Sequence, residues 1–275
     1  MPADQLILAI LNLGLIALAL GVFLTMLFRG AFHEKSLRLG PTRDLHQPAW
    51  VYAVGIGGVG LYSACKLFVR GEQPTSVLLV IELIPYAMIG LLLGRARVAE
   101  AGFRKLGILP RWPIRDTGWG LAGGIVGLGL AGAVGLVVNL ISEALGQPVD
   151  PVAHEALKTL REEFSMNLLI ALIISAVFLA PLVEEFVFRG IFQTSLLRLF
   201  RGMRWPGLIV ASAVFSVIHI AVVPWQGLIP LFVLGLVWGY LYERTGSLLV
   251  PILSHAVFNA ANIVLALHLP EQLPQ

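Results

Sequence analysis

Long, uninterrupted runs of apolar residues alternate with short polar segments along most of the 275-residue chain. A run of about 18 apolar residues or more predicts a membrane-spanning helix, because about 20 helical residues cross the hydrocarbon layer. We therefore predict an all-α, polytopic membrane bundle of about eight transmembrane helices. The predicted spans are Leu6–Phe28, Trp50–Phe68, Ser76–Leu93, Trp119–Leu140, Met166–Leu182, Gly207–Pro224, Gly227–Tyr242 and Leu248–Leu267.

Composition and charge agree with this pattern and add an orientation. Apolar residues make up 57% of the chain and charged residues 13%, whereas about a quarter of an ordinary soluble domain is charged. Fourteen lysines and arginines lie in one set of alternate loops and three in the other set. The positive-inside rule then places both termini outside. The net charge of +3 reflects this orientation and gives no reason to expect nucleic-acid binding.

The chain reads as one integral domain, because no fixed-period repeat or low-complexity linker divides it. Residues 1–145 contain the first four spans without an assignable motif, residues 166–268 contain the candidate chemistry, and the loop 146–165 is the expected boundary. Glycines in the second and fourth spans predict close helix packing. The single cysteine, Cys65, cannot form an internal disulfide and is interpreted as a small packing residue.

Polar residues inside the spans are the candidates for function, because an ionisable group in lipid usually faces a protein interior or a watery cavity. All four aspartates lie in tails or loops, so a two-aspartate intramembrane protease is not supported. No histidine–glutamate pair continues into a zincin motif. The embedded residues are Lys66, Glu82, Glu184, Glu185, Arg189, His219, His255 and Asn259, with Asn262 nearby.

Two adjacent glutamates and an arginine stand out in PLVEEFVFRG, residues 181–190. Pro181 predicts a break or kink, after which a new helical stretch runs from Leu182 towards residue 200. On that stretch Glu185 and Arg189 are four residues apart and can pair, while Glu184 is rotated by about 100°. A salt bridge at the end of a span explains this stretch equally well. The similar REEFSMN, residues 161–167, has no matching arginine and is interpreted as a solvated loop.

Two later spans contribute further polar groups, His219 in FSVIH and the pair His255 and Asn259 in HAVFN. Hydrogen bonding between helices would explain each of them separately. At about 1.5 Å per residue from the expected inside face, these three and Glu184 lie at overlapping depths of about 10–21 Å. Independent structural contacts would not be expected to coincide in depth. We therefore predict one shared site.

The three sequences EEFVFR, FSVIH and HAVFN resemble, in order, the EExxxR, FxxxH and HxxxN motifs of the CPBP family, which includes the type II CAAX prenyl endopeptidases. The resemblance covers roughly Met166 to Leu267. It implies an intramembrane glutamate-type endopeptidase without a metal or other cofactor. The implied roles are Glu184 as general base acting on water with His219, His255 and Asn259 as oxyanion donors, and Glu185 and Arg189 as the supporting pair.

The resemblance also implies the partners, which are the lipid bilayer and a peptide or lipidated protein substrate of the CAAX type or another membrane-associated type. We expect a multi-pass protein of a prokaryotic plasma membrane, with a site that opens towards the cytoplasm. Nothing in the sequence indicates the oligomeric state.

Three alternatives stay open. Zinc could be held by Glu184, His219 and His255, since two histidines and a carboxylate are a known ligand set. The same fold could serve a non-catalytic scaffold or a bacteriocin-immunity-type protein. A proton-coupled transporter could use Glu82 and Glu184 with the histidines as a relay, although the two halves show no matching interrupted spans of the kind that marks transporter repeats.

Overall fold

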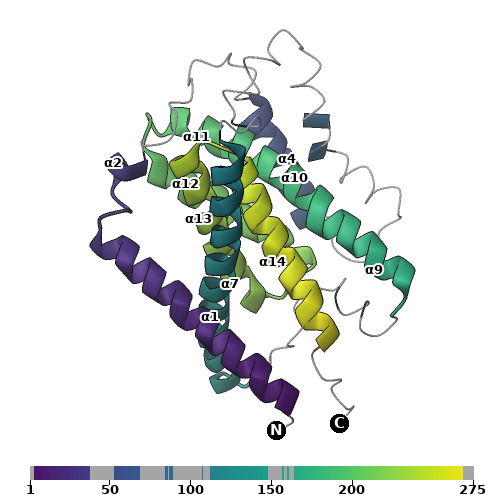
Figure 1. Ribbon diagram of the computed structural model, residues 1–275. Coiled ribbons are helices and arrows are strands. Elements are labelled where there is room, and N and C mark those ends of the chain that lie inside the picture. Colours follow the sequence, from purple (N-terminus) through teal and green to yellow (C-terminus); the bar gives the residue numbers. More distant parts are fainter. Residues whose placement is uncertain are drawn as a thin grey trace.

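In the computed structural model of the protein, every regular element among the described residues is a helix (Figure 1). This confirms the all-α prediction for that part of the chain. The described residues are 3–37, 53–68, 84–85, 87–88, 107, 112–147, 157, 160 and 164–268. The helices are α1 (Ala3–Phe28), α2 (Glu34–Leu37), η1 (Ala53–Gly57), α4 (Gly58–Phe68), α7 (Pro113–Ala144), α9 (Met166–Leu172), η2 (Ile173–Leu179), α10 (Ala180–Glu185), η3 (Phe186–Gln193), α11 (Thr194–Leu199), α12 (Arg204–Val217), η4 (Ile218–Ala221), α13 (Trp225–Thr245) and α14 (Leu249–His268).

Five helices in the described ranges are long and apolar enough to cross a membrane, compared with the eight spans predicted. Two further predicted spans correspond to shorter apolar helices, Ala53–Cys65 and Arg204–Ile220. The predicted span Ser76–Leu93, with Glu82, falls almost entirely outside the described residues. The five long helices are Ala9–Phe28, Pro113–Ala144, Met166–Leu199, Trp225–Thr245 and Leu249–His268.

Of the break or kink predicted at Pro181, the break is wrong, because one helix runs from Met166 to Leu199. Proline lacks an N–H and its ring clashes with the carbonyl four residues earlier in a regular α-helix. Here the turn that precedes Pro181 is π-helical, over Ile173–Leu179. A π-helical turn changes the local hydrogen-bond pattern, so the ring is accommodated without ending the helix. A second π-helical segment, η3, follows and contains Arg189.

Helix α7 contacts α1, α13 and α14 and lies between α1 and α14 in Figure 1. Its glycines allow the close approach that the sequence predicted. A Cβ added to Gly120 would lie 2.7 Å from the Cβ of Leu253 on α14, and one added to Gly129 would lie 2.5 Å from the Cβ of Ala19 on α1. Glycine packing in this span is therefore confirmed.

The core of the described part surrounds η3, every residue of which is buried. Large fully buried side chains from three elements meet there, including Phe188 of η3, Phe215 of α12 and Trp238 of α13. The second half of the long helix thus lies inside the protein, whereas much of its first half is exposed. This arrangement carries the polar residues of the PLVEEFVFRG stretch from the exposed half into the core.

Candidate functional site

The glutamate–arginine pair predicted from the four-residue spacing is present. Arg189 Nε lies 2.9 Å from Glu185 Oε2, and both side chains are fully buried. The guanidinium carbon lies 5.1 Å from the ring centroid of Phe215 and 5.9 Å from that of Trp238. Aromatic faces attract a cation most strongly where water is absent. The pair therefore sits in an apolar, aromatic setting and not at a solvated helix end.

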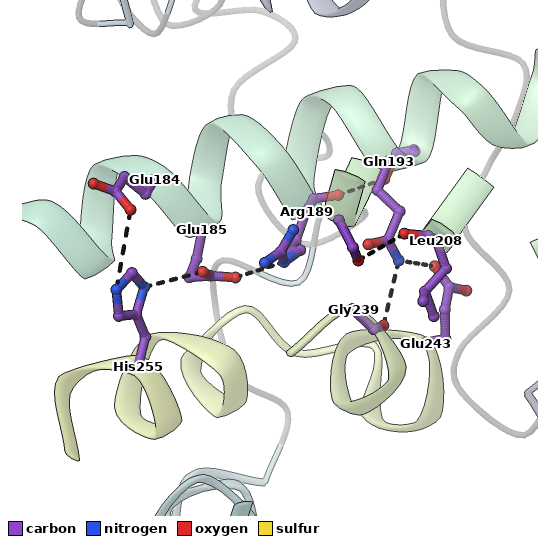
Figure 2. A network of polar contacts seen from close by, with 10 residues as sticks. Glu184, Glu185, Arg189, Gln193, Leu208, Gly239, Glu243 and His255 are labelled. Carbon is purple, nitrogen blue, oxygen red and sulfur yellow. Dashed lines mark hydrogen bonds and ion pairs between the residues drawn. The ribbon is translucent and has the colours of Figure 1, made fainter. Parts of the chain in front are cut away.

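His255 of α14 lies between the two adjacent glutamates, as Figure 2 shows. Its Nδ1 is 3.1 Å from Glu185 Oε1, and its Nε2 is 4.0 Å from Glu184 Oε2. Glu185 is fully buried, whereas the side chain of Glu184 keeps 28% of its surface exposed. Of the two carboxylates, Glu184 is therefore the one that water or a substrate can reach.

Aromatic rings enclose the imidazole of His255. Trp238 of α13 stacks on it with ring centroids 3.9 Å apart and planes inclined by 16°. Phe215 meets it edge-on at 6.1 Å. Trp238 was not among the residues predicted from the sequence, since it lies in a span without an assigned motif and its side-chain direction depends on how three helices pack.

His219 lies on the short 3₁₀ segment η4, which follows α12 directly. Its Nδ1 is 2.7 Å from the carbonyl oxygen of Phe215, and the centroids of the His219 and Phe215 rings are 4.7 Å apart. Because a carbonyl can only accept, Nδ1 donates and Nε2 is left as the nitrogen that can take up a proton. Within the described residues no hydrogen bond or ion pair joins His219 to Glu184. Phe215 is thus the residue that contacts both histidines.

Asn259, one turn after His255 on α14, binds the long helix at a second level. Its Nδ2 donates to the carbonyl oxygen of Ala176, at 2.7 Å, inside the π-helical segment η2. Asn262 bonds the carbonyl of Phe258 on its own helix, so it does not join the shared cluster. His255 and Asn259 together hold α14 against the helix that carries both glutamates.

A second buried polar cluster lies further along the same long helix (Figure 2). Gln193 Nε2 donates to Glu243 Oε1 at 2.8 Å and to the carbonyl oxygen of Gly239 at 3.3 Å. Arg204 pairs with the other oxygen of the Glu243 carboxylate. Neither Gln193 nor Glu243 was predicted among the embedded residues, since both lie at or beyond the ends of the expected spans. This cluster links the long helix, α12 and α13.

No group of three histidine, cysteine, aspartate or glutamate side chains that could hold a metal ion occurs in the described part of the chain. The set suggested for zinc, Glu184, His219 and His255, is therefore not assembled as a ligand cluster. Its two histidine rings are instead held by Phe215 and Trp238.

Residues 166–261 match the family model described as Type II CAAX prenyl endopeptidase Rce1-like. This part of the chain, the Rce1-like region, is thus similar to the type II CAAX prenyl endopeptidases. The resemblance seen in the three motifs is thus confirmed, and the Rce1-like region contains all six residues assigned from it. Together with the five long apolar helices, this similarity fits an integral membrane protein.

An Escherichia coli protein described as "Uncharacterized 24.3 kDa protein" is 31% identical over 129 residues. The aligned part covers 46% of this chain and 58% of that relative. Its description assigns no activity. No solved structure matches the chain.

Proposed function

We propose that the protein is an intramembrane endopeptidase of the glutamate type. The observation that carries the proposal is the position of His255, whose two ring nitrogens face Glu184 and Glu185 beside the fully buried Arg189. Burying ionisable side chains together is costly unless they are paired. A cluster of this kind, with one carboxylate still accessible, is typical of a functional site.

Glu184 acts as the general base in this scheme. It removes a proton from a water molecule, whose oxygen attacks the carbonyl carbon of the scissile peptide bond. When the tetrahedral intermediate collapses, the C–N bond breaks and the leaving amine takes the proton from Glu184. General acid–base catalysis of this kind contributes about 10²–10⁴-fold. The partial exposure of Glu184 supports this role over Glu185, which is sealed between Arg189 and His255.

His219 assists Glu184 in holding the water. The hydrogen bond from its Nδ1 to Phe215 leaves Nε2 as a hydrogen-bond acceptor for that water. No hydrogen bond or ion pair joins His219 to Glu184 in the described part of the chain. In this scheme the two side chains therefore act through one water molecule that both of them bind.

His255 and Asn259 stabilise the oxyanion. The amide of Asn259 has two N–H groups, of which Ala176 accepts one, so the second is available. Glu185 accepts a hydrogen bond from Nδ1 of His255, and Nε2 donates to the oxyanion when it carries a proton. Loss of one oxyanion donor costs about 10²–10³ in turnover. Glu185 and Arg189 thus support the site and do not touch the substrate.

The similarity of residues 166–261 to the Rce1-like family supports a substrate class. We propose membrane-associated peptides, either prenylated proteins of the CAAX type or other membrane-tethered precursors. The distribution of lysines and arginines supports a site that opens towards the cytoplasm, with both termini outside. The scheme uses no metal ion.

The test compares wild type with Glu184→Ala in proteoliposomes. Two fluorogenic peptides of one sequence are offered, one farnesylated at a CAAX cysteine and one carrying an acyl anchor and no prenyl group. We expect wild type to cleave at least one peptide and Glu184→Ala to cleave neither. Equal cleavage by both proteins would rule out the proposed base, and no cleavage by wild type would favour a non-catalytic role.

A further inference from the structure

The most tightly stacked ring pair of the site comes from a helix to which the catalytic scheme assigns no residue. Trp238 of α13 lies flat on the imidazole of His255, with centroids 3.9 Å apart and planes within 16°. We propose that Trp238 is a positioning residue that sets the plane of the His255 ring. This inference rests on the proposed function, since it concerns the orientation of a group assigned to that reaction.

One contact alone does not fix an imidazole. The hydrogen bond between Nδ1 and Glu185 holds one nitrogen, but the ring can still rotate about the Cβ–Cγ bond and about that contact, because such sp³–sp² torsions are broad. Rotation would swing Nε2 away from Glu184, which it now faces at 4.0 Å. A flat surface pressed against the ring removes this freedom. Trp238 supplies such a surface.

The indole is itself held in place. It is fully buried. Its ring centroid lies 5.7 Å from that of Phe215 and 6.2 Å from that of Phe258, and both of these rings are steeply inclined to the indole. The next residue, Gly239, accepts a hydrogen bond from Gln193 of the long helix. This bond holds α13 in position along the helix that carries the two glutamates. The indole of Trp238 is therefore held in place, and it restricts rotation of the His255 imidazole.

A role as ordinary packing explains the position less well. Buried tryptophans usually give their indole N–H a partner, yet Trp238 Nε1 has none among the described residues. A smaller apolar side chain would fill space here without an unsatisfied donor. What tryptophan adds at this position is its face, and that face is occupied by His255.

The experiment measures kcat and KM for the farnesylated peptide in proteoliposomes with Trp238→Phe, Trp238→Leu and the control Trp205→Leu. Trp205 is a second tryptophan of the helical core, packed against Phe32 and Tyr240 away from His255. Trp238→Phe keeps a flat ring at this position, so its kcat should stay within about 3-fold of the wild-type value. Trp238→Leu should lower kcat by about 10–100-fold with KM changed less than about 2-fold, because small misplacements of a catalytic group cost up to about 10²-fold. Trp205→Leu should keep kcat.

A double variant tests whether Trp238 acts through His255. Trp238→Leu in a His255→Ala background should leave the residual kcat unchanged, since groups that act as a unit are not additive. If Trp238→Leu does not fold, Trp238→Met gives the same comparison. Equal losses for Trp238→Leu and Trp205→Leu, or a further loss in the His255→Ala background, would overturn the positioning role. A wild type without Glu184-dependent cleavage would instead overturn the proposed function.

Discussion

The buried pair of Glu185 and Arg189 allows a quantitative prediction about stability. Both side chains are fully buried and their charged atoms lie 2.9 Å apart. Removing one partner leaves an uncompensated charge, which costs about 3–5 kcal/mol in a protein interior. Glu185→Leu and Arg189→Met should each lower the free energy of unfolding by about that amount. Replacing both removes both charges, so the double variant should be more stable than Glu185→Leu by about 2 kcal/mol or more.

The assay is reversible unfolding of the purified protein in mixed micelles, followed by circular dichroism as the fraction of denaturing detergent rises. Arg29→Met serves as the matched control because Arg29 is exposed, and it should change the free energy by no more than about 0.5 kcal/mol. Proteolytic activity separates the two roles of Glu185. The double variant should regain stability but not activity, because His255 has lost the carboxylate that orients Nδ1.

An additive result would refute this reasoning. If the loss in the double variant equals the sum of the two single losses, Glu185 and Arg189 do not compensate each other's charge. Recovery of both stability and activity would contradict the part of the account in which Glu185 orients His255.

Two further predictions concern packing around the long helix. A Cβ added to Gly55 would overlap Ser195 and lie 2.9 Å from Ile191 Cγ2, so Gly55→Ala should lower the free energy of unfolding by about 1–3 kcal/mol. A Cβ added to the control residue Gly57 meets no atom within 4 Å, so Gly57→Ala should not destabilise the protein. Equal effects of the two substitutions in detergent unfolding would contradict this prediction. Gln193→Leu removes two buried hydrogen bonds and should cost about 1–3 kcal/mol in the same assay; a change under about 0.5 kcal/mol would show that this cluster does not stabilise the fold.

Regular spacing on a helix made part of the site predictable. Residues four apart share one face, so the sequence alone pairs Glu185 with Arg189 and places His255 on the same side of its helix as Asn259. Both expectations agree with the contacts, since Arg189 binds Glu185 and the α14 residues reach the long helix one turn apart. The clustering of glutamates with His255 also follows from their overlapping depths.

Contacts between different helices were harder to predict from the sequence. The sequence did not predict that the imidazole of His255 would face Glu184, and the joint action of Glu184 and His219 stays a prediction. Which histidine approaches depends on crossing angles and on rings such as Trp238, and neither is encoded in the spacing within one helix. For the same reason the cluster of Gln193 and Glu243 was missed, because its members come from distant parts of the chain.

Local backbone geometry accounts for the remaining difference. Proline is a strong signal for a helix end, but a π-helical turn before Pro181 lets the helix continue to Leu199. Such turns have no sequence signature as clear as that of proline, and they occur often at functional sites. The loop pair Glu162 and Glu163, interpreted as solvated, lies outside the described residues and stays a prediction.

The central claim is that the carboxylate of Glu184 activates the attacking water. The most direct measurement is the single-turnover cleavage rate of wild type, Glu184→Gln and Glu162→Gln in proteoliposomes with the better of the two peptides. Glutamine keeps the shape of the side chain but cannot accept the proton, so Glu184→Gln should lose about 10²–10⁴-fold. Glu162→Gln, the equivalent change in the second glutamate pair, should match wild type. A Glu184→Gln rate within about 3-fold of wild type would contradict the claim.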